Sequence, residues 1–119
     1  MRTLAGIGLY MVVAICCLAP VGAARSSENV EADAIATGRQ LAVQFCSGCH
    51  AIDKVGDSPN PASPPFRTLS SRYPIESLEE ALAEGISVGH AEMPQFEFGP
   101  SQVADLISYL KSVQPHGGK

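Results

Sequence analysis

The sequence predicts an all-α domain, and three observations support this fold class. Apolar residues recur at helical intervals in three separate stretches, as they do along the buried face of a helix. No stretch alternates apolar and polar residues for long enough to form a β-strand. Proline and glycine gather between the helical stretches, where they interrupt regular structure. We therefore expect three main helices joined by irregular segments.

The first predicted helix spans residues 31–46. Its apolar residues follow a helical spacing that no proline interrupts: Ala34, Ile35, Leu41, Ala42, Phe45 and Cys46. A loop is expected over residues 51–66, because Gly56 and the prolines of this segment are typical of turns and do not continue a helix.

The second helix is expected to begin at Pro74, because proline suits the first turn of a helix, where its missing N–H costs nothing. Gly85 and Gly89 lie where this helix should end. After an irregular segment over residues 89–100, Ser101 is the expected N-cap of the last helix. The buried stripe of that helix is Val103, Leu106, Ile107, Leu110 and Val113.

Residues 1–24 are typical of a secretory signal peptide. Arg2 precedes a long uncharged apolar stretch, and small residues follow Pro20. The same stretch is long enough for the alternative, a single membrane-spanning anchor. Pro20 and the alanine-rich exit favour cleavage, so we expect a mature, exported chain that begins near Arg25.

The mature chain should consist of a short N-terminal segment (25–33), one folded domain (34–114) and a disordered tail (115–119). About 95 residues form only a small core, so covalent or metallic support is expected. The chain is acidic, with a net charge of −4, and its basic residues are scattered rather than clustered. This charge pattern argues against nucleic acid as a partner.

The sequence Cys46-Ser47-Gly48-Cys49-His50 has the Cys-x-x-Cys-His spacing at which haem c is attached. Two thiols three positions apart at the end of a helix can reach the two vinyl groups on one edge of the porphyrin and form thioethers. The adjacent imidazole then lies beneath the iron as its proximal ligand. The motif therefore predicts one covalently attached haem at Cys46 and Cys49, with His50 as an iron ligand.

Two other sites could use these cysteines. A structural zinc ion needs four Cys or His ligands, and only Cys46, Cys49, His50, His90 and His116 remain after the leader. That set lacks the usual second pair of ligands. A thioredoxin-like redox pair would follow a strand in a βαβ unit, and no such strand is expected here.

The candidate for the second axial ligand of the iron is Met93. It is the only methionine of the mature chain and is followed by Pro94, outside any expected helix, where a packing methionine is unusual. Its thioether sulfur is a soft neutral donor that raises the reduction potential of a haem. Two alternatives remain: His90 as the ligand, or an open, five-coordinate iron.

The chain resembles class I cytochromes c, and specifically the short bacterial type, over roughly residues 34–113. The resemblance rests on the haem motif near the end of an N-terminal helix, a proline-containing loop, Met93-Pro94 and a C-terminal helix. It implies the cytochrome c fold around one haem. One departure is Ala42, where the family has an aromatic residue for which Phe45 could compensate.

The resemblance also implies roles for single residues. Gly38 and Tyr109 match the positions at which the first and last helices of the family cross closely. Pro64, or else Pro65, matches the proline whose carbonyl accepts a hydrogen bond from the proximal histidine. Arg72 matches an arginine that binds a haem propionate. The alternative for Arg72 is a solvated surface side chain.

A haem would supply the apolar centre that a chain of this length lacks, so we expect the haem-free form to be largely unfolded. The predicted wall around it is Leu41, Phe45, Phe66, Leu69, Leu82, Ile86, Phe96, Leu106 and Leu110.

Together these features predict an electron-transfer protein rather than an enzyme, because two axial ligands leave no vacancy for a substrate. The expected role is a periplasmic carrier between redox protein partners, with membrane contact only through those partners or an uncleaved leader. Two other roles are a permanently bound haem subunit of a periplasmic dehydrogenase and a haem-based small-molecule sensor or peroxidase. The acidic residues of the second helix are expected to be a solvated face more than a docking site: Glu76, Glu79, Glu80 and Glu84.

Overall fold

The computed structural model describes residues 26–85 and 93–115. The predictions made for the leader (1–24), for Ile86, His90 and His116, and for the tail beyond Pro115 lie outside the described residues. In the part of the chain that is described, no helix is both long and apolar enough to cross a membrane.

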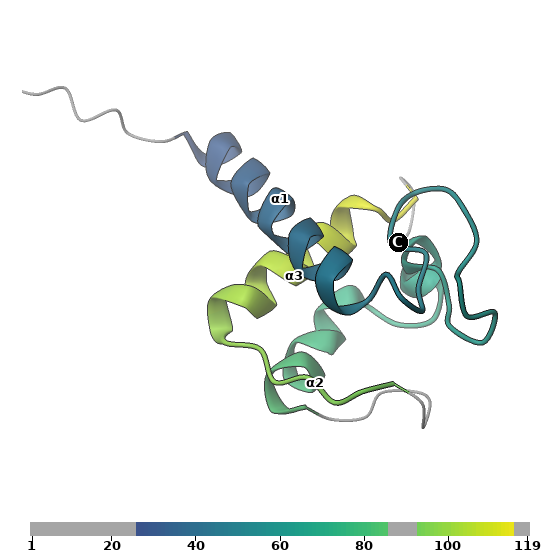
Figure 1. Ribbon diagram of the computed structural model, residues 1–119. Coiled ribbons are helices and arrows are strands. Elements are labelled where there is room, and N and C mark those ends of the chain that lie inside the picture. The colour runs from purple at the N-terminus through teal and green to yellow at the C-terminus, as the bar shows by residue number, and fades with distance from the viewer. Residues whose placement is uncertain (1–25, 86–92, 116–119) are drawn as a thin grey trace, which may run out of the picture.

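The described residues form helices and irregular segments, without a strand. Three α-helices, α1 (Ser27–Phe45), α2 (Leu78–Glu84) and α3 (Pro100–Ser112), are joined by two short 3₁₀ helices, η1 (Phe66–Ser71) and η2 (Ile75–Ser77). Figure 1 shows α1 running across α3, while the loop after α1 extends away from the crossing before it returns to η1. The predicted all-α class with three main helices is confirmed.

The helix α1 begins at Ser27, four residues before the predicted start, so most of the expected N-terminal segment 25–33 is helical. The apolar spacing on which the prediction depended begins only at Ala34. The earlier residues nevertheless favour a helix, because Glu28 in the first turn complements the positive end of the helix dipole.

The crossing of α1 and α3 depends on Gly38, which is buried in α1. A side chain at this position would overlap the carbonyl group of Asp105, and its Cβ would lie 2.8 Å from the Cβ of Tyr109. The two helices therefore approach so closely that only glycine fits at the contact. The predicted crossing of Gly38 and Tyr109 is confirmed.

The second helical stretch starts after Pro74 as predicted, but it begins as the 3₁₀ turn η2 before it continues as α2. It ends at Gly85, whose φ of 71° is in the left-handed region that favours glycine. The helix η1 was not predicted, because the sequence of this segment has no helical spacing that distinguishes it from the loop before it.

The expectation that Ser101 caps the last helix is wrong. Gly99 is the N-cap, Pro100 occupies the first turn, and Ser101 lies inside α3. The N–H of Gly99 donates to the side-chain oxygen of Gln102 at 3.0 Å, and the Gly99 carbonyl accepts from the N–H of Val103. The helix therefore begins at the proline, which the same rules of helix initiation favour.

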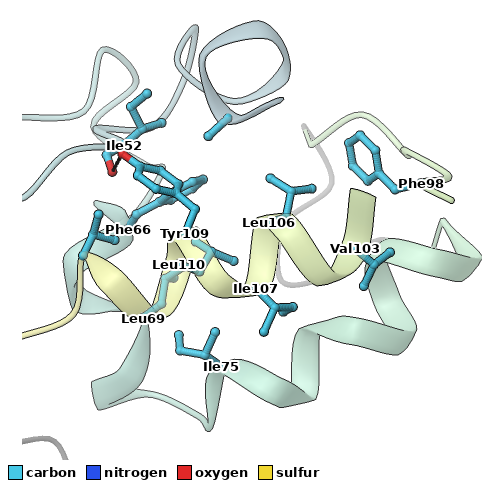
Figure 2. Packing of buried hydrophobic residues seen from close by; sticks show 12 residues of the cluster. Ile52, Phe66, Leu69, Ile75, Phe98, Val103, Leu106, Ile107, Tyr109 and Leu110 are labelled. Carbon is cyan, nitrogen blue, oxygen red and sulfur yellow. Dashed lines mark hydrogen bonds between the residues drawn. The ribbon is translucent and has the colours of Figure 1, made fainter. Parts of the chain in front are cut away.

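The core of the domain forms along α3. Its predicted stripe is buried, and Figure 2 shows Val103, Leu106, Ile107 and Leu110 on this helix packed among residues of the other elements. Tyr109 extends from α3 toward the segment after the Cys-x-x-Cys-His motif, where its hydroxyl lies 3.1 Å from the Ile52 carbonyl. The core thus joins α1, η1 and α3 to the segment that follows the motif.

Candidate functional site

The Cys-x-x-Cys-His motif lies on the turn that ends α1. Cys46 is the C-cap of the helix, and the N–H groups of Cys49 and His50 both donate to the Cys46 carbonyl, at 3.1 and 2.9 Å. This turn continues directly from the helix, so both thiols and the imidazole lie at the same end of α1. No disulfide joins Cys46 to Cys49, and Cys46 is half-buried whereas Cys49 is exposed.

The Cys46 side chain does not have the lowered pKa of a redox-active thiol. Burial raises its pKa to about 11, with a smaller contribution from the neighbouring Cys49. Thioredoxin-like cysteines have a lowered pKa instead. Because the described residues also contain no strand, this geometry does not fit a thioredoxin-like redox pair.

The imidazole of His50 is held by the proline segment that precedes η1. Its Nδ1 lies 2.7 Å from the carbonyl oxygen of Pro64. Because a carbonyl oxygen can only accept, Nδ1 is the protonated nitrogen and Nε2 keeps its lone pair for a metal ion. Of the two prolines considered from the sequence, the structure has Pro64 in this contact. The ring of Phe66 lies beside the imidazole, with centroids 5.3 Å apart.

The loop after the motif folds back onto it and so brings Pro64 to the histidine. The N–H of Asn60 donates to the Cys49 carbonyl at 3.1 Å, and the N–H of Ser63 donates to the Asn60 carbonyl at 2.9 Å. The hydroxyl of Ser58 accepts from the N–H of Ala51 at 3.0 Å. These bonds explain why a segment rich in proline and polar residues still has a defined path.

A cavity that opens to solvent lies at this end of α1. Its wall contains Cys46, Cys49, His50 and Met93, which joins them from a distant part of the sequence. Seven of the predicted wall residues line it: Phe45, Phe66, Leu69, Leu82, Phe96, Leu106 and Leu110. The cavity can therefore take a large, mostly apolar group with sulfur and nitrogen donors around it.

Leu41, which was also predicted for this wall, does not line the cavity. It packs against the hydrophobic core instead. Its helical spacing from Phe45 suggested a shared face, but the cavity begins only at the last turn of α1. Six lining residues were not among the predicted wall or site residues: Asn60, Ala62, Ser63, Tyr73, Leu78 and Pro94. Among these, only Leu78 carried a usable signal, because it belongs to the apolar spacing of the second helix.

The segment that contains Met93 is anchored to α1 and α2 by aromatic and backbone contacts. The Phe45 ring meets those of Phe96 and Phe98 edge to face, with centroids 5.6 and 5.4 Å apart. The N–H of Phe98 donates to the Leu82 carbonyl at 3.0 Å. Phe45 thus connects the end of α1 to the Met93 segment. The alternative ligand His90 lies outside the described residues.

The polar groups at the cavity are few. Arg72 and Tyr73 line it while remaining exposed to solvent, as a side chain that binds a propionate at the haem edge would. Partial burial raises the pKa of the Tyr73 phenol. Ser63 also lines the cavity and is only 2% exposed, and its hydroxyl has no partner among the described residues.

The fold and the cavity together define an all-helical domain with an open, mostly apolar cavity that sulfur and nitrogen donors line. The family model of cytochrome c matches residues 35–114, and the chain belongs to the cytochrome c family. Searches of curated proteins and of solved structures find no significant match.

Membership of this family makes the chain a haem-binding electron-transfer protein with covalently attached haem c. The residues of the cavity fit this cofactor. Two thiols are available for thioethers, an imidazole and a thioether are available for the iron, and the apolar walls suit the macrocycle. In residues 26–85 and 93–115, no three side chains of His, Cys, Asp or Glu come together as a site for a bare metal ion.

Proposed function

We propose that this protein carries single electrons between redox partners through one haem, with Cys46 and Cys49 as its covalent attachment points and His50 and Met93 as its axial ligands. The observation that carries the proposal is that all four side chains line one cavity. Three of them are neighbours in the sequence, and the fold brings Met93 to them from beyond α2.

His50 is suited to the proximal position. Its hydrogen bond to Pro64 leaves Nε2 as the donor atom and fixes the plane of the ring. Met93 is half-buried in a segment that the aromatic rings of Phe96 and Phe98 hold against α1. A thioether ligand favours ferrous iron and so supports a high reduction potential.

The bound haem supplies a one-electron couple, while the chain's own residues determine what can reach it. If both axial positions are occupied by protein atoms, no position is left for a substrate, so the protein acts as a carrier rather than as an enzyme. Arg72 is proposed to bind a propionate, because it lines the cavity from an exposed position where a guanidinium can pair with a carboxylate.

The proposed location is the periplasm, after export directed by residues 1–24. Members of this family are typically exported, which supports this location. Cell fractionation and N-terminal sequencing of the purified protein test it. A mature chain that begins near Arg25 in the periplasmic fraction is expected, and a chain that retains Met1 in the membrane fraction would contradict cleavage.

Absorption spectra of the oxidised and reduced holoprotein test the ligands. We expect low-spin spectra in both states and, in the ferric protein, the weak red band of methionine-bound iron. Met93→Ala should lose that band, whereas the matched variant His90→Ala should keep it. If the red band were lost in His90→Ala instead, or if the ferrous wild-type protein bound carbon monoxide readily at neutral pH, the proposed His50–Met93 pair would be wrong.

A further inference from the structure

Gln114 lies just beyond the C-terminal end of α3, and both polar atoms of its side-chain amide are hydrogen-bonded. Nε2 donates to the carbonyl oxygens of Phe66 at 2.9 Å and of Leu110 at 2.6 Å. Oε1 accepts from the N–H of Ser70 at 3.0 Å. Since carbonyl groups only accept and a backbone N–H only donates, this set of partners fixes the orientation of the amide. Gln114 therefore joins the C-terminal end of α3 to both ends of η1.

Phe66, one of the residues held by Gln114, is also bound to the haem motif. Its N–H donates to the carbonyl of Ala51, the residue after His50, at 2.9 Å. Its side chain is buried, and its ring lies 5.3 Å from the His50 ring between centroids. The position of Phe66 is thus determined on one side by the proximal segment and on the other by Gln114.

The path from Phe66 to the histidine's hydrogen-bond acceptor is short and stiff. Pro65 separates Phe66 from Pro64, and its φ of −59° is the value to which the proline ring restricts it. A shift of Phe66 therefore moves the Pro64 carbonyl, which lies 2.7 Å from Nδ1 of His50.

We infer that Gln114 is a positioning residue for the proximal ligand: its amide holds Phe66 so that the Pro64 carbonyl stays aligned with His50. This inference rests on the proposed function, because it takes His50 to be the axial ligand. A well-formed bond from Nδ1–H to a carbonyl raises the basicity of the imidazole and stabilises ferric iron. Loss of the Gln114 contacts should therefore raise the reduction potential.

The test compares variants of the holoprotein. Gln114→Leu removes all three hydrogen bonds, and Gln114→Glu removes both donors while it keeps the acceptor for Ser70. The control is Gln102→Leu, which removes a hydrogen bond of similar length at the other end of α3, where Gln102 lines no part of the cavity. The measurements are the reduction potential and the paramagnetically shifted haem methyl resonances, which report the orientation of the axial ligands.

We expect Gln114→Leu to show a higher potential than the wild type, and both Gln114 variants to show a changed pattern of haem methyl shifts. Gln102→Leu should keep the wild-type values even if its melting temperature is lower. If the Gln114 variants lose thermal stability but keep the wild-type potential and methyl pattern, Gln114 has only a structural role and the inference is wrong. Wild-type spectra without histidine ligation would instead overturn the proposed function, and the two failures are therefore distinguishable.

Discussion

Replacing Gly38 with alanine tests how closely the two long helices must approach. The new methyl group would overlap the Asp105 carbonyl and lie 2.8 Å from the Cβ of Tyr109. These atoms belong to the backbone and the first side-chain carbon of α3, so no side-chain rotation can make room and the helices must separate. Overpacking of this kind costs typically about 1–3 kcal/mol. Because the contact is with backbone, we expect the upper end of that range.

The helix propensity of alanine offsets part of this cost, since alanine is about 1 kcal/mol more favourable than glycine inside a helix. The expected net loss is therefore about 2 kcal/mol, which for a domain of this size lowers the melting temperature by on the order of 10 °C. Gln40→Ala, at an exposed position of the same helix, is the control and should change stability little.

Thermal unfolding followed by far-UV circular dichroism measures both variants as holoproteins. Gly38 does not line the cavity, so the absorption spectrum of Gly38→Ala should remain that of the wild type at room temperature. If Gly38→Ala melts at or above the wild-type temperature, the helices have room at this crossing and the argument from close approach is refuted.

Three further predictions concern single contacts. Burial and the neighbouring Asp53 raise the pKa of Tyr109 from 10.0 to about 12, so its stabilising effect should be complete below pH 10 and be lost as the pH rises toward 12. The free energy of unfolding of the wild type, measured across this pH range, should show that loss. An equal loss in Tyr109→Phe would mean that the loss does not come from Tyr109. Gly85→Ala should lower the free energy of unfolding, measured with denaturant, by about 1 kcal/mol or more, because φ at this position is 71°. An unchanged denaturation midpoint would be evidence against this backbone geometry. Ser63→Ala should stabilise the holoprotein by about 1 kcal/mol, since it removes a buried hydroxyl without a partner in the described structure. A clear loss of stability would mean that the hydroxyl has a partner when haem is bound.

The features that could be predicted from the sequence are those encoded locally. The stripe on α3, the glycine that ends α2 and the Cys-x-x-Cys-His turn each depend on residues within a few positions of one another. Local rules also account for the misplaced cap of α3, because Ser101 and the pair Gly99-Pro100 both signal a helix start and the structure uses the second.

The contacts that could not be predicted join residues far apart in the chain. Gln114 and Phe66 are 48 positions apart, and neither residue type indicates the other. The same holds for Arg39, whose guanidinium lies 3.2 Å from both carboxylate oxygens of Asp53, which in turn lies 3.1 Å from the Tyr109 hydroxyl. The pairing of His50 with Pro64 was anticipated only because the chain resembles a known family.

Mass spectrometry of the purified mature protein tests the central claim most directly. After extraction with acidified acetone and proteolysis, the peptide containing Cys46 and Cys49 should carry the mass of one haem. The double variant Cys46→Ala, Cys49→Ala should lack that mass. If the pigment dissolves in the extract and the wild-type peptide has its unmodified mass, no haem is bonded to these cysteines and the proposed attachment is contradicted.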